Sequence, residues 1–184
     1  MNKRKEEQKP MPKLIFKMMS LTAAVFYKVI DLSKQVRKSG VREGQAVLDF
    51  GCGSGHFTIA AAQIVGEKGK VYALDIHPLA INAVERKVIK NNLSNVTTII
   101  SNRDTGLPDE SIDVVLLYRT FYLVKDKQGL LDELHRVLKP GGILSVLGGG
   151  VQACLKALEK DVRFSLSDRS RRLLNFRKVS GRVR

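Results

Sequence analysis

The chain has 184 residues, of which 43% are hydrophobic, and a formal net charge of +14. This length is typical of one domain with a single core, and no apolar run reaches the roughly 20 residues that span a bilayer. The two cysteines, Cys52 and Cys154, have no spacing that favours a disulfide framework or a zinc site, so we expect a cytoplasmic protein.

The positive charge is concentrated at the two ends of the chain. Residues 1–42 hold 11 Lys and Arg against three acids, residues 160–184 hold nine against two, and residues 43–159 are nearly neutral. Clustered basic ends can bind nucleic acid or an anionic membrane surface, or can serve solubility alone. Residues 1–13 are polar and charged, so we expect a flexible basic lead-in before one domain over 14–184.

The first predicted elements are one or two helices over residues 14–38, where lysines interrupt an apolar stretch. We expect residues 14–40 to form a helical cap on a ligand-binding core at 45–150. A helix and a hairpin are expected over 151–184. The N-terminal helix could pack on the core, close over a hydrophobic ligand or lie on a membrane surface.

From Ala46 onward the sequence alternates between strands and helices. The predicted strands are residues 46–50, 71–76, 96–100, 112–118 and 143–147. The predicted helices are residues 56–65, a helix opened by Pro78, residues 126–138 (ended by Lys-Pro-Gly-Gly) and residues 151–160.

Five strands that alternate with helices predict a parallel sheet covered on both faces. Two further apolar stretches, 162–168 and 171–179, are separated by only a few residues, which predicts an antiparallel hairpin. The expected fold is therefore α/β and Rossmann-like, with a doubly wound, mostly parallel seven-stranded sheet that ends in this hairpin.

The stretch VLDFGCGSGHF, residues 47–57, places glycines at alternate positions directly after a strand. A strand, a glycine turn and a helix bring backbone N–H groups to the carboxyl edge of the sheet, where ligands bind. A dinucleotide site has the spacing G-x-G-x-x-G, which this loop lacks. Asp49 before the glycines instead suits a ligand that carries a positive group.

Two more acids lie at the end of a predicted strand or just beyond one. Asp75 ends the second strand, where an acid can accept both ribose hydroxyls of an adenosine ligand. Asp104 lies just beyond the third strand and could accept a hydrogen bond from an adenine amino group. Each acid could also be a cap or turn residue.

The motifs VLDFGCGSG, VYALDI, LPDESIDVVLLY and LHRVLKPGGIL, in this order, resemble those of class I S-adenosylmethionine-dependent methyltransferases. The resemblance covers about residues 40–150 and is strongest to the small-molecule group that includes the ubiquinone and menaquinone biosynthesis enzymes. It implies S-adenosyl-L-methionine as the cofactor and methyl transfer to a small, apolar acceptor by in-line displacement.

The resemblance also implies roles for matched positions. The loop around the methionine part of the cofactor would be formed by Asp49, Gly51, Cys52, Gly53 and Gly55. Asp75 would hold the ribose hydroxyls, and Ile76 would lie against the adenine. Asp104 would meet the adenine amino group, and Tyr118 would lie near the methionine end.

The sequence departs from the family pattern in two places. The spacer between Asp104 and the following Leu-Pro is short, and YRTFYL stands where methyltransferases of nucleic-acid amino groups carry Asn/Asp-Pro-Pro-Tyr/Phe. The candidates for a catalytic base are His56, Arg119 and Tyr122, and the sequence does not choose among them. No metal site is expected.

Two alternatives to a small-molecule methyltransferase stay open at this point. One is an RNA methyltransferase that uses the basic termini, which would bind RNA in a salt-sensitive way. The other is a non-catalytic protein that binds S-adenosylmethionine, because a fold by itself does not establish an activity.

Overall fold

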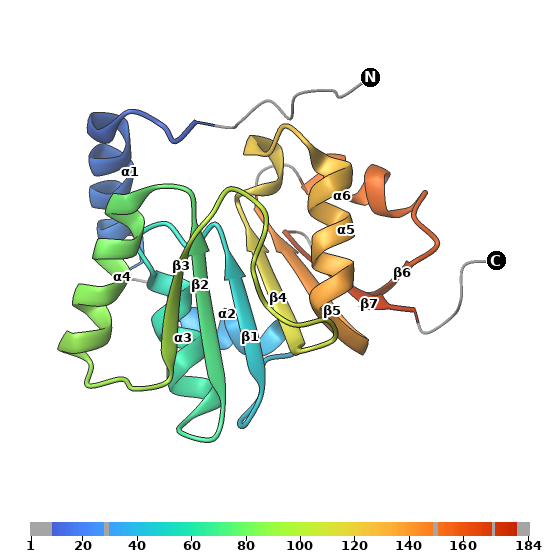
Figure 1. Cartoon of the computed structure of the whole chain (residues 1–184), viewed down its shortest axis with the longest axis horizontal. Coiled ribbons are helices and arrows are strands. Elements are labelled where there is room, and N and C mark those ends of the chain that lie inside the picture. Colours follow the sequence, from blue (N-terminus) through green and yellow to red (C-terminus); the bar gives the residue numbers. More distant parts are fainter. Residues whose placement is uncertain (1–8, 28–29, 149–150, 171, 180–184) are drawn as a thin grey trace.

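The structure is a computed structural model that describes residues 9–27, 30–148, 151–170 and 172–179. Its strands form one seven-stranded sheet in the order β3-β2-β1-β4-β5-β7-β6 (Figure 1). The strands are β1 (Ala46–Phe50), β2 (Lys70–Asp75), β3 (Val96–Ile100), β4 (Ile112–Tyr118), β5 (Leu138–Leu147), β6 (Phe164–Arg169) and β7 (Leu173–Lys178). The helices are α1 (Lys13–Phe26), α2 (Leu32–Lys38), α3 (His56–Val65), α4 (Pro78–Lys90), α5 (Lys127–Val137) and α6 (Val151–Leu158), with a short 3-10 helix, η1 (Phe121–Leu123).

Strands β1 to β5 pair in parallel, and β7 runs antiparallel between β5 and β6. The predicted α/β fold, with its mostly parallel sheet and terminal hairpin, is therefore confirmed. The strand order reverses between β1 and β4, since β1 leads to β2 and β3 on one side and β4 to β5 on the other. In open α/β sheets, ligands bind at such a reversal, outside the carboxyl ends of the strands.

The start of β5 differs from the prediction. We expected Lys-Pro-Gly-Gly to be a turn before a strand at residue 143, but β5 already begins at Leu138, which pairs with Ile112. The next pair joins Val114 to Ile143, so residues 139–142 form an irregularity opposite a single residue of β4. The turn residues are therefore accommodated inside the strand as a bulge.

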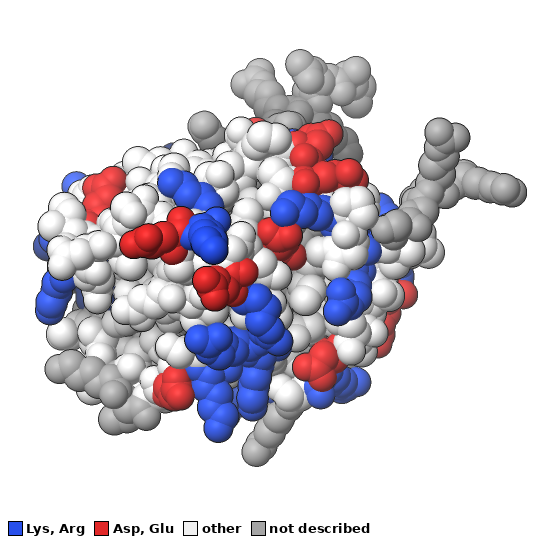
Figure 2. All heavy atoms as spheres, turned by 90° about the horizontal axis from the view of Figure 1, so that it is seen from below, with Lys and Arg blue, Asp and Glu red and all other residues white. Residues whose placement is uncertain are grey.

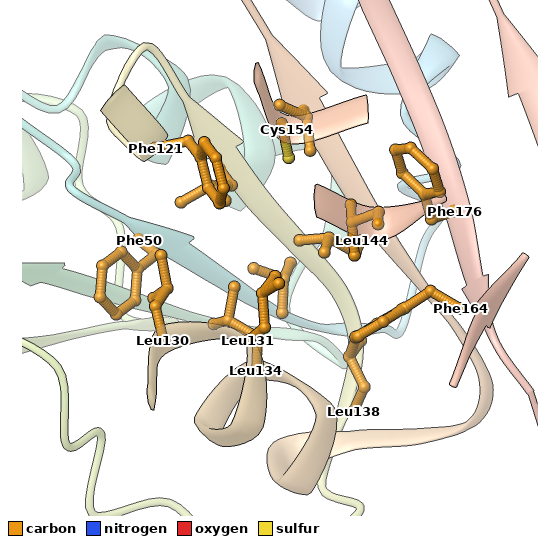
Figure 3. Close-up of a cluster of buried hydrophobic side chains, with 14 of the residues drawn as sticks. Phe50, Phe121, Leu130, Leu131, Leu134, Leu138, Leu144, Cys154, Phe164 and Phe176 are labelled. Atoms are coloured by element: carbon orange, nitrogen blue, oxygen red, sulfur yellow. The ribbon is translucent and has the colours of Figure 1, made fainter. Parts of the chain in front are cut away.

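The two faces of the sheet carry separate hydrophobic clusters. Successive residues of a strand point to opposite faces, so Val47 packs under α2 and α3, whereas Leu48 packs under α5 and α6. Figure 3 shows the second cluster, in which Phe121, Leu130 and Phe176 from distant parts of the chain meet between the sheet and its helices. Buried strands and helices on both faces make the carboxyl edge a rigid platform for a site.

The two N-terminal helices are held very differently. Helix α2 buries Val36, and the Asn175 side chain of β7 donates to the carbonyl of Lys38 at 2.9 Å. Helix α1 lies beside α4 (Figure 1) and buries only Phe16. Among the parts of the chain that the structure describes, no helix has both the length and the apolarity needed to cross a membrane.

Candidate functional site

The glycine loop follows β1 and is fastened to the end of β2. The backbone N–H groups of Gly51 and Cys52 both donate to the carbonyl of Leu74, at 2.7 and 2.9 Å. The N–H of Gly55 donates back to the carbonyl of Cys52 at 2.9 Å, which closes the turn before α3 begins at His56. The loop is therefore fixed at the point where the strand order reverses.

The three glycines of the loop have different surroundings. A Cβ on Gly51 would collide with the side chain of Thr120, and a Cβ on Gly55 would lie 2.8 Å from Val84 of α4. A Cβ on Gly53 would meet no protein atom within 4 Å. Gly51 and Gly55 thus let neighbouring elements pack closely, whereas Gly53 faces open space that a ligand can approach.

Asp75, at the end of β2, is held in one orientation by the loop. Its two carboxylate oxygens accept from the backbone N–H of Gly53 at 2.9 Å and from that of His77 at 2.8 Å. Burial raises the pKa of Asp75 above its ordinary value, and these two hydrogen bonds oppose the shift. A carboxylate has about four acceptor positions, so Asp75 can accept two further hydrogen bonds from a ligand.

Asp49 is the second acid of this edge and is 2% exposed. The hydroxyl of Thr58, in the first turn of α3, donates to its Oδ2 at 2.6 Å. Burial raises the pKa of Asp49 to about 7, and the charge of Asp75 adds to the rise. A nearby positive ligand would favour the ionised form of such a carboxyl.

The glycine loop, Asp49 and Asp75 all lie within a part of the chain that matches a known protein family. Residues 42–172 match a family model described as "Methyltransferase domain". The chain belongs to this methyltransferase family. The predicted class I S-adenosylmethionine-dependent methyltransferase resemblance is confirmed, and S-adenosylmethionine is the cofactor that this kind of domain uses.

Curated relatives include the demethylmenaquinone methyltransferase of Geobacillus stearothermophilus, 40% identical over 109 residues. The ubiquinone/menaquinone biosynthesis C-methyltransferase of Vibrio vulnificus is 39% identical over 111 residues. Each match covers 59% of this chain but only 47% and 43% of those proteins. The matched region therefore spans less than half the length of these relatives.

Solved methyltransferases share the fold over nearly the whole chain. A SAM-dependent methyltransferase from Aquifex aeolicus has a TM-score of 0.75 at 24% identity, covering 92% of this chain and 98% of that one. A putative S-adenosylmethionine-dependent methyltransferase from Methanococcus maripaludis has a TM-score of 0.78 at 15% identity, covering 100% and 99%. At these identities the likeness is one of fold.

Besides Asp49, two further predicted residues of this methyltransferase site have buried side chains. Cys52 is 8% exposed and packs with Ile81 and Val84 of α4, where burial raises the pKa of its thiol well above the usual value. The Tyr118 hydroxyl is hydrogen-bonded to Ser39, and burial raises its pKa to about 12. The side chains of both residues are therefore engaged in contacts within the protein.

Asp104 lies in the segment after β3, and its side chain is 78% exposed. Arg103 pairs with it at 3.2 Å and with Asp126, the N-cap of α5, at 2.6 Å. Ile76, directly after Asp75, is half-buried. Ile76 thus directly follows β2 and Asp104 lies four residues beyond the end of β3, and their roles toward adenine stay predictions.

The segment that carries Asp104 is anchored to α5 by residues that the sequence analysis did not single out. Glu133 accepts from the backbone N–H and the hydroxyl of Thr105, at 2.9 and 2.6 Å. Arg136 donates to Glu133 and to the carbonyl of Leu107. The hydrogen bonds from Arg136 and Thr105 lower the pKa of Glu133 to about 2. The available signal was the Leu-His-Arg motif, because an arginine in this helix can form hydrogen bonds to a neighbouring loop.

His56, a candidate base, opens α3 beside a lysine that the sequence analysis did not single out. The Lys87 ammonium donates to the carbonyl of Ser54 at 2.7 Å and to His56 Nε2 at 3.2 Å. Burial lowers the pKa of His56 to about 4, and the positive charge of Lys87 contributes to the shift. Burial also lowers the pKa of Lys87, to about 8. With this nitrogen engaged and so low a pKa, His56 is poorly suited to take a proton near pH 7.

Arg119 and Tyr122 lie in the segment after β4, which is on the opposite side of β1 from β2. Arg119 has a positive φ of 57°, and its guanidinium donates to the Tyr27 hydroxyl at 3.4 Å. Tyr122, within η1, is 49% exposed. Both side chains are available to a substrate, and neither contacts the buried acids in a way that would make it a base.

His77 is a further residue that the sequence analysis missed. It caps α4 by accepting from the N–H of Leu79 at 3.1 Å, so its other nitrogen carries the proton in the neutral ring. That atom, Nε2, is buried without a partner among the described residues, and the ring stacks on Phe16 of α1 at 4.5 Å. The available signal was its position directly before Pro78, because Pro favours the first position of a helix and the residue before it is then the N-cap.

Basic side chains gather on the opposite edge of the sheet, as Figure 2 shows in a view from below. A cavity of about 350 Å³ lies there, lined by Arg42, Lys139 and Arg177 together with the bulge of β5. Lys139 is paired with Asp113 at 2.8 Å. This basic cavity lies at the amino ends of β1, β4 and β5, and so is separate from the glycine loop.

Proposed function

We propose that this domain transfers a methyl group from S-adenosylmethionine to a small, apolar acceptor. The observation that carries the proposal is the Asp75 carboxylate, fixed by the N–H groups of Gly53 and His77 beside a loop that leaves open space. The quinone methyltransferase names of the relatives support the class of acceptor.

The residues at this edge fit the cofactor. Gly53 has no side chain, so the open space beside it is free for a ligand. Asp75 keeps two acceptor positions for the two ribose hydroxyls. Asp49 would face the positive methionine end together with the backbone of residues 51–55. Ile76 and Asp104 would contact the adenine, and the backbone of Tyr118 would border the methionine end.

When bound, the cofactor supplies a methyl group on a sulfonium, a good leaving group for in-line displacement. The contribution of the protein is then largely to hold the acceptor about 3 Å from that methyl group and in line with it. The segment 119–126 and Tyr27 border the edge on the acceptor side. Arg119 is suited to orient a polar oxygen of an otherwise apolar acceptor, because its guanidinium is always charged.

Binding and transfer are tested in sequence. We expect calorimetric titration to show micromolar binding of S-adenosylmethionine and of its demethylated product, and none of NAD. Radiolabelled methyl transfer is then measured with quinone-like compounds, apolar phenols and RNA as acceptors. Binding of neither sulfur compound would contradict the proposal, and transfer to RNA alone would replace its acceptor.

The RNA alternative receives less support from the placement of charge. The basic cavity lies at the amino edge of the sheet, whereas the acids and the glycine loop lie at the carboxyl edge. Binding of a phosphate backbone by Arg42, Lys139 and Arg177 would therefore hold RNA away from the cofactor.

Cofactor affinity is expected to depend on pH through Asp49. Burial raises the pKa of Asp49 to about 7, so the free protein loses this charge as the pH falls below 7. A cationic ligand binds the carboxylate form better, so its affinity should rise from pH 6 to pH 8 by up to about tenfold. Calorimetry at pH 6, 7 and 8 measures the rise.

The control for this pH dependence is Asp49→Asn, which has no titrating carboxyl and should bind with nearly the same affinity at the three pH values. Equal affinity of the native protein at pH 6 and pH 8 would show that Asp49 does not face the positive end of the cofactor.

A further inference from the structure

Helix α1 exposes an unusual amount of apolar surface. Leu14, Met18, Leu21 and Val25 are 70%, 62%, 69% and 65% exposed, and Ile15, Met19 and Phe26 are each about half exposed. Soluble proteins rarely leave contiguous apolar patches of this kind uncovered. No residue of the described chain covers this side of the helix.

The exposed residues form one continuous side of α1, which we call the outer face. Positions 14, 18, 21 and 25 follow the i, i+4, i+7, i+11 spacing of a single stripe, and 15, 19 and 26 form the stripe next to it. The stripe formed by Phe16, Ala23 and Tyr27 faces the domain. The helix is therefore amphipathic, with its more apolar side turned away from the protein.

The charges next to the outer face are all positive. Lys13 and Lys17 are exposed, lie one turn apart along the edge of the outer face, and follow Lys9. Residues 8–30 contain no Asp or Glu. An apolar side flanked by lysines and free of acids is complementary to an anionic lipid surface, which takes apolar side chains and attracts basic ones.

The position of α1 connects this surface to the candidate site. Phe16 stacks on His77, which lies two residues beyond Asp75. At the other end of the helix, Tyr27 lies 5.2 Å from the rings of His56 and Phe57 at the start of α3. The inner side of α1 therefore contacts residues next to Asp75 and at the start of α3, and the outer face is turned away from the domain beside the candidate site.

We propose that α1 docks the protein on an anionic membrane surface, with its outer face in the interface and its lysines at the lipid headgroups. The helix has 14 residues and is about 21 Å long, which suits lying in the interface rather than spanning the bilayer. Docking would hold the candidate site close to the lipid, so that an apolar acceptor reaches it from the membrane. This last step rests on the proposed function, whereas the docking does not.

Vesicle co-sedimentation of the full chain tests the docking. We expect binding to vesicles of phosphatidylcholine mixed with phosphatidylglycerol, weak binding to phosphatidylcholine alone, and a loss of binding in high salt. Changing Leu14, Met18, Leu21 and Val25 together to Gln should weaken binding by more than about tenfold. Lys13→Gln with Lys17→Gln should weaken binding to the anionic vesicles only.

The matched control changes two equally exposed apolar residues elsewhere, Ile89→Gln and Val162→Gln, which are 76% and 75% exposed and should bind like the native chain. The proposal is overturned if the native chain ignores anionic vesicles or if the four-Gln variant binds them equally well. It is also overturned if light scattering shows a native dimer that the four-Gln variant converts to a monomer, because a second copy would then cover the outer face.

Titration with S-adenosylmethionine in the absence of vesicles separates this proposal from the proposed function. The native chain and the four-Gln variant should bind the cofactor equally, since the changed side chains point away from the domain. Loss of vesicle binding with intact cofactor binding supports docking through α1. Vesicle binding by a native chain that does not bind the cofactor would support docking while contradicting the methyltransferase function.

Discussion

Replacing Asp75 with alanine should lower the affinity for S-adenosylmethionine by more than about tenfold. The change removes the acceptor for both ribose hydroxyls, and a lost pair of such hydrogen bonds costs on the order of 1.5–3 kcal/mol. It also frees the N–H groups of Gly53 and His77, which now donate to this carboxylate. Calorimetric titration of the native chain and the variant measures the loss.

The control for this experiment is Asp75→Asn, which keeps one oxygen and the size of the side chain and should lose less affinity than the alanine variant. Thermal unfolding of both variants tells whether the loop is still formed. A folded alanine variant with native affinity would remove Asp75 from the cofactor site.

Replacing Gly55 with alanine should destabilise the fold by about 2–5 kcal/mol. The residue has a φ of 78°, a left-handed conformation that costs other residues roughly 1–2 kcal/mol. Its new methyl group would also lie 2.8 Å from Val84 Cγ2 and 3.3 Å from Val84 Cα, so α4 would have to shift, at a further cost of about 1–3 kcal/mol. Denaturant unfolding measures the change in free energy.

Gly44 provides a matched control for the backbone cost. It has the same φ of 78°, but a Cβ there would meet nothing within 4 Å. Gly44→Ala should therefore show only the backbone cost, and the difference between the two variants isolates the contact with Val84. Equal destabilisation by both variants would show that α4 yields to the extra methyl group.

Local signals were sufficient to predict most of the fold. Strand β1, the glycine loop and α3 occupy consecutive residues, so an apolar run, three glycines and a helical spacing predicted all of them correctly. Strand β5 was placed five residues too late, because Lys-Pro-Gly-Gly usually ends an element. The prediction was wrong because Leu138 already pairs with β4, and Lys-Pro-Gly-Gly forms a bulge within the strand.

Tertiary contacts decided what the sequence left open at the site. Lys87 is 31 residues from His56 along the chain, and only the packing of α4 against α3 shows that it engages this candidate base. The buried side chain of Tyr118 likewise follows from the contact between β4 and Ser39 after α2. Such contacts carry no local sequence signal, whereas Asp49 and Asp75 were identified from their positions near the carboxyl ends of strands.

The sequence pattern also did not show which side of α1 packs against the domain. Its residues are apolar on several sides, so spacing alone did not tell whether the helix would be buried, close over a ligand or stay partly exposed. Stacking of Phe16 on His77 fixes the inner side, and the outer face follows from it.

The contact between Gly51 and Thr120 links the two halves of the edge energetically. Gly51 belongs to the loop assigned to the cofactor, and Thr120, whose hydroxyl donates to the carbonyl of Tyr118 at 3.0 Å, opens the segment assigned to the acceptor. A ligand that displaces Thr120 must therefore also disturb the glycine loop. Because binding free energies are linked, a ligand that displaced Thr120 and the cofactor would each change the affinity of the other by the same factor.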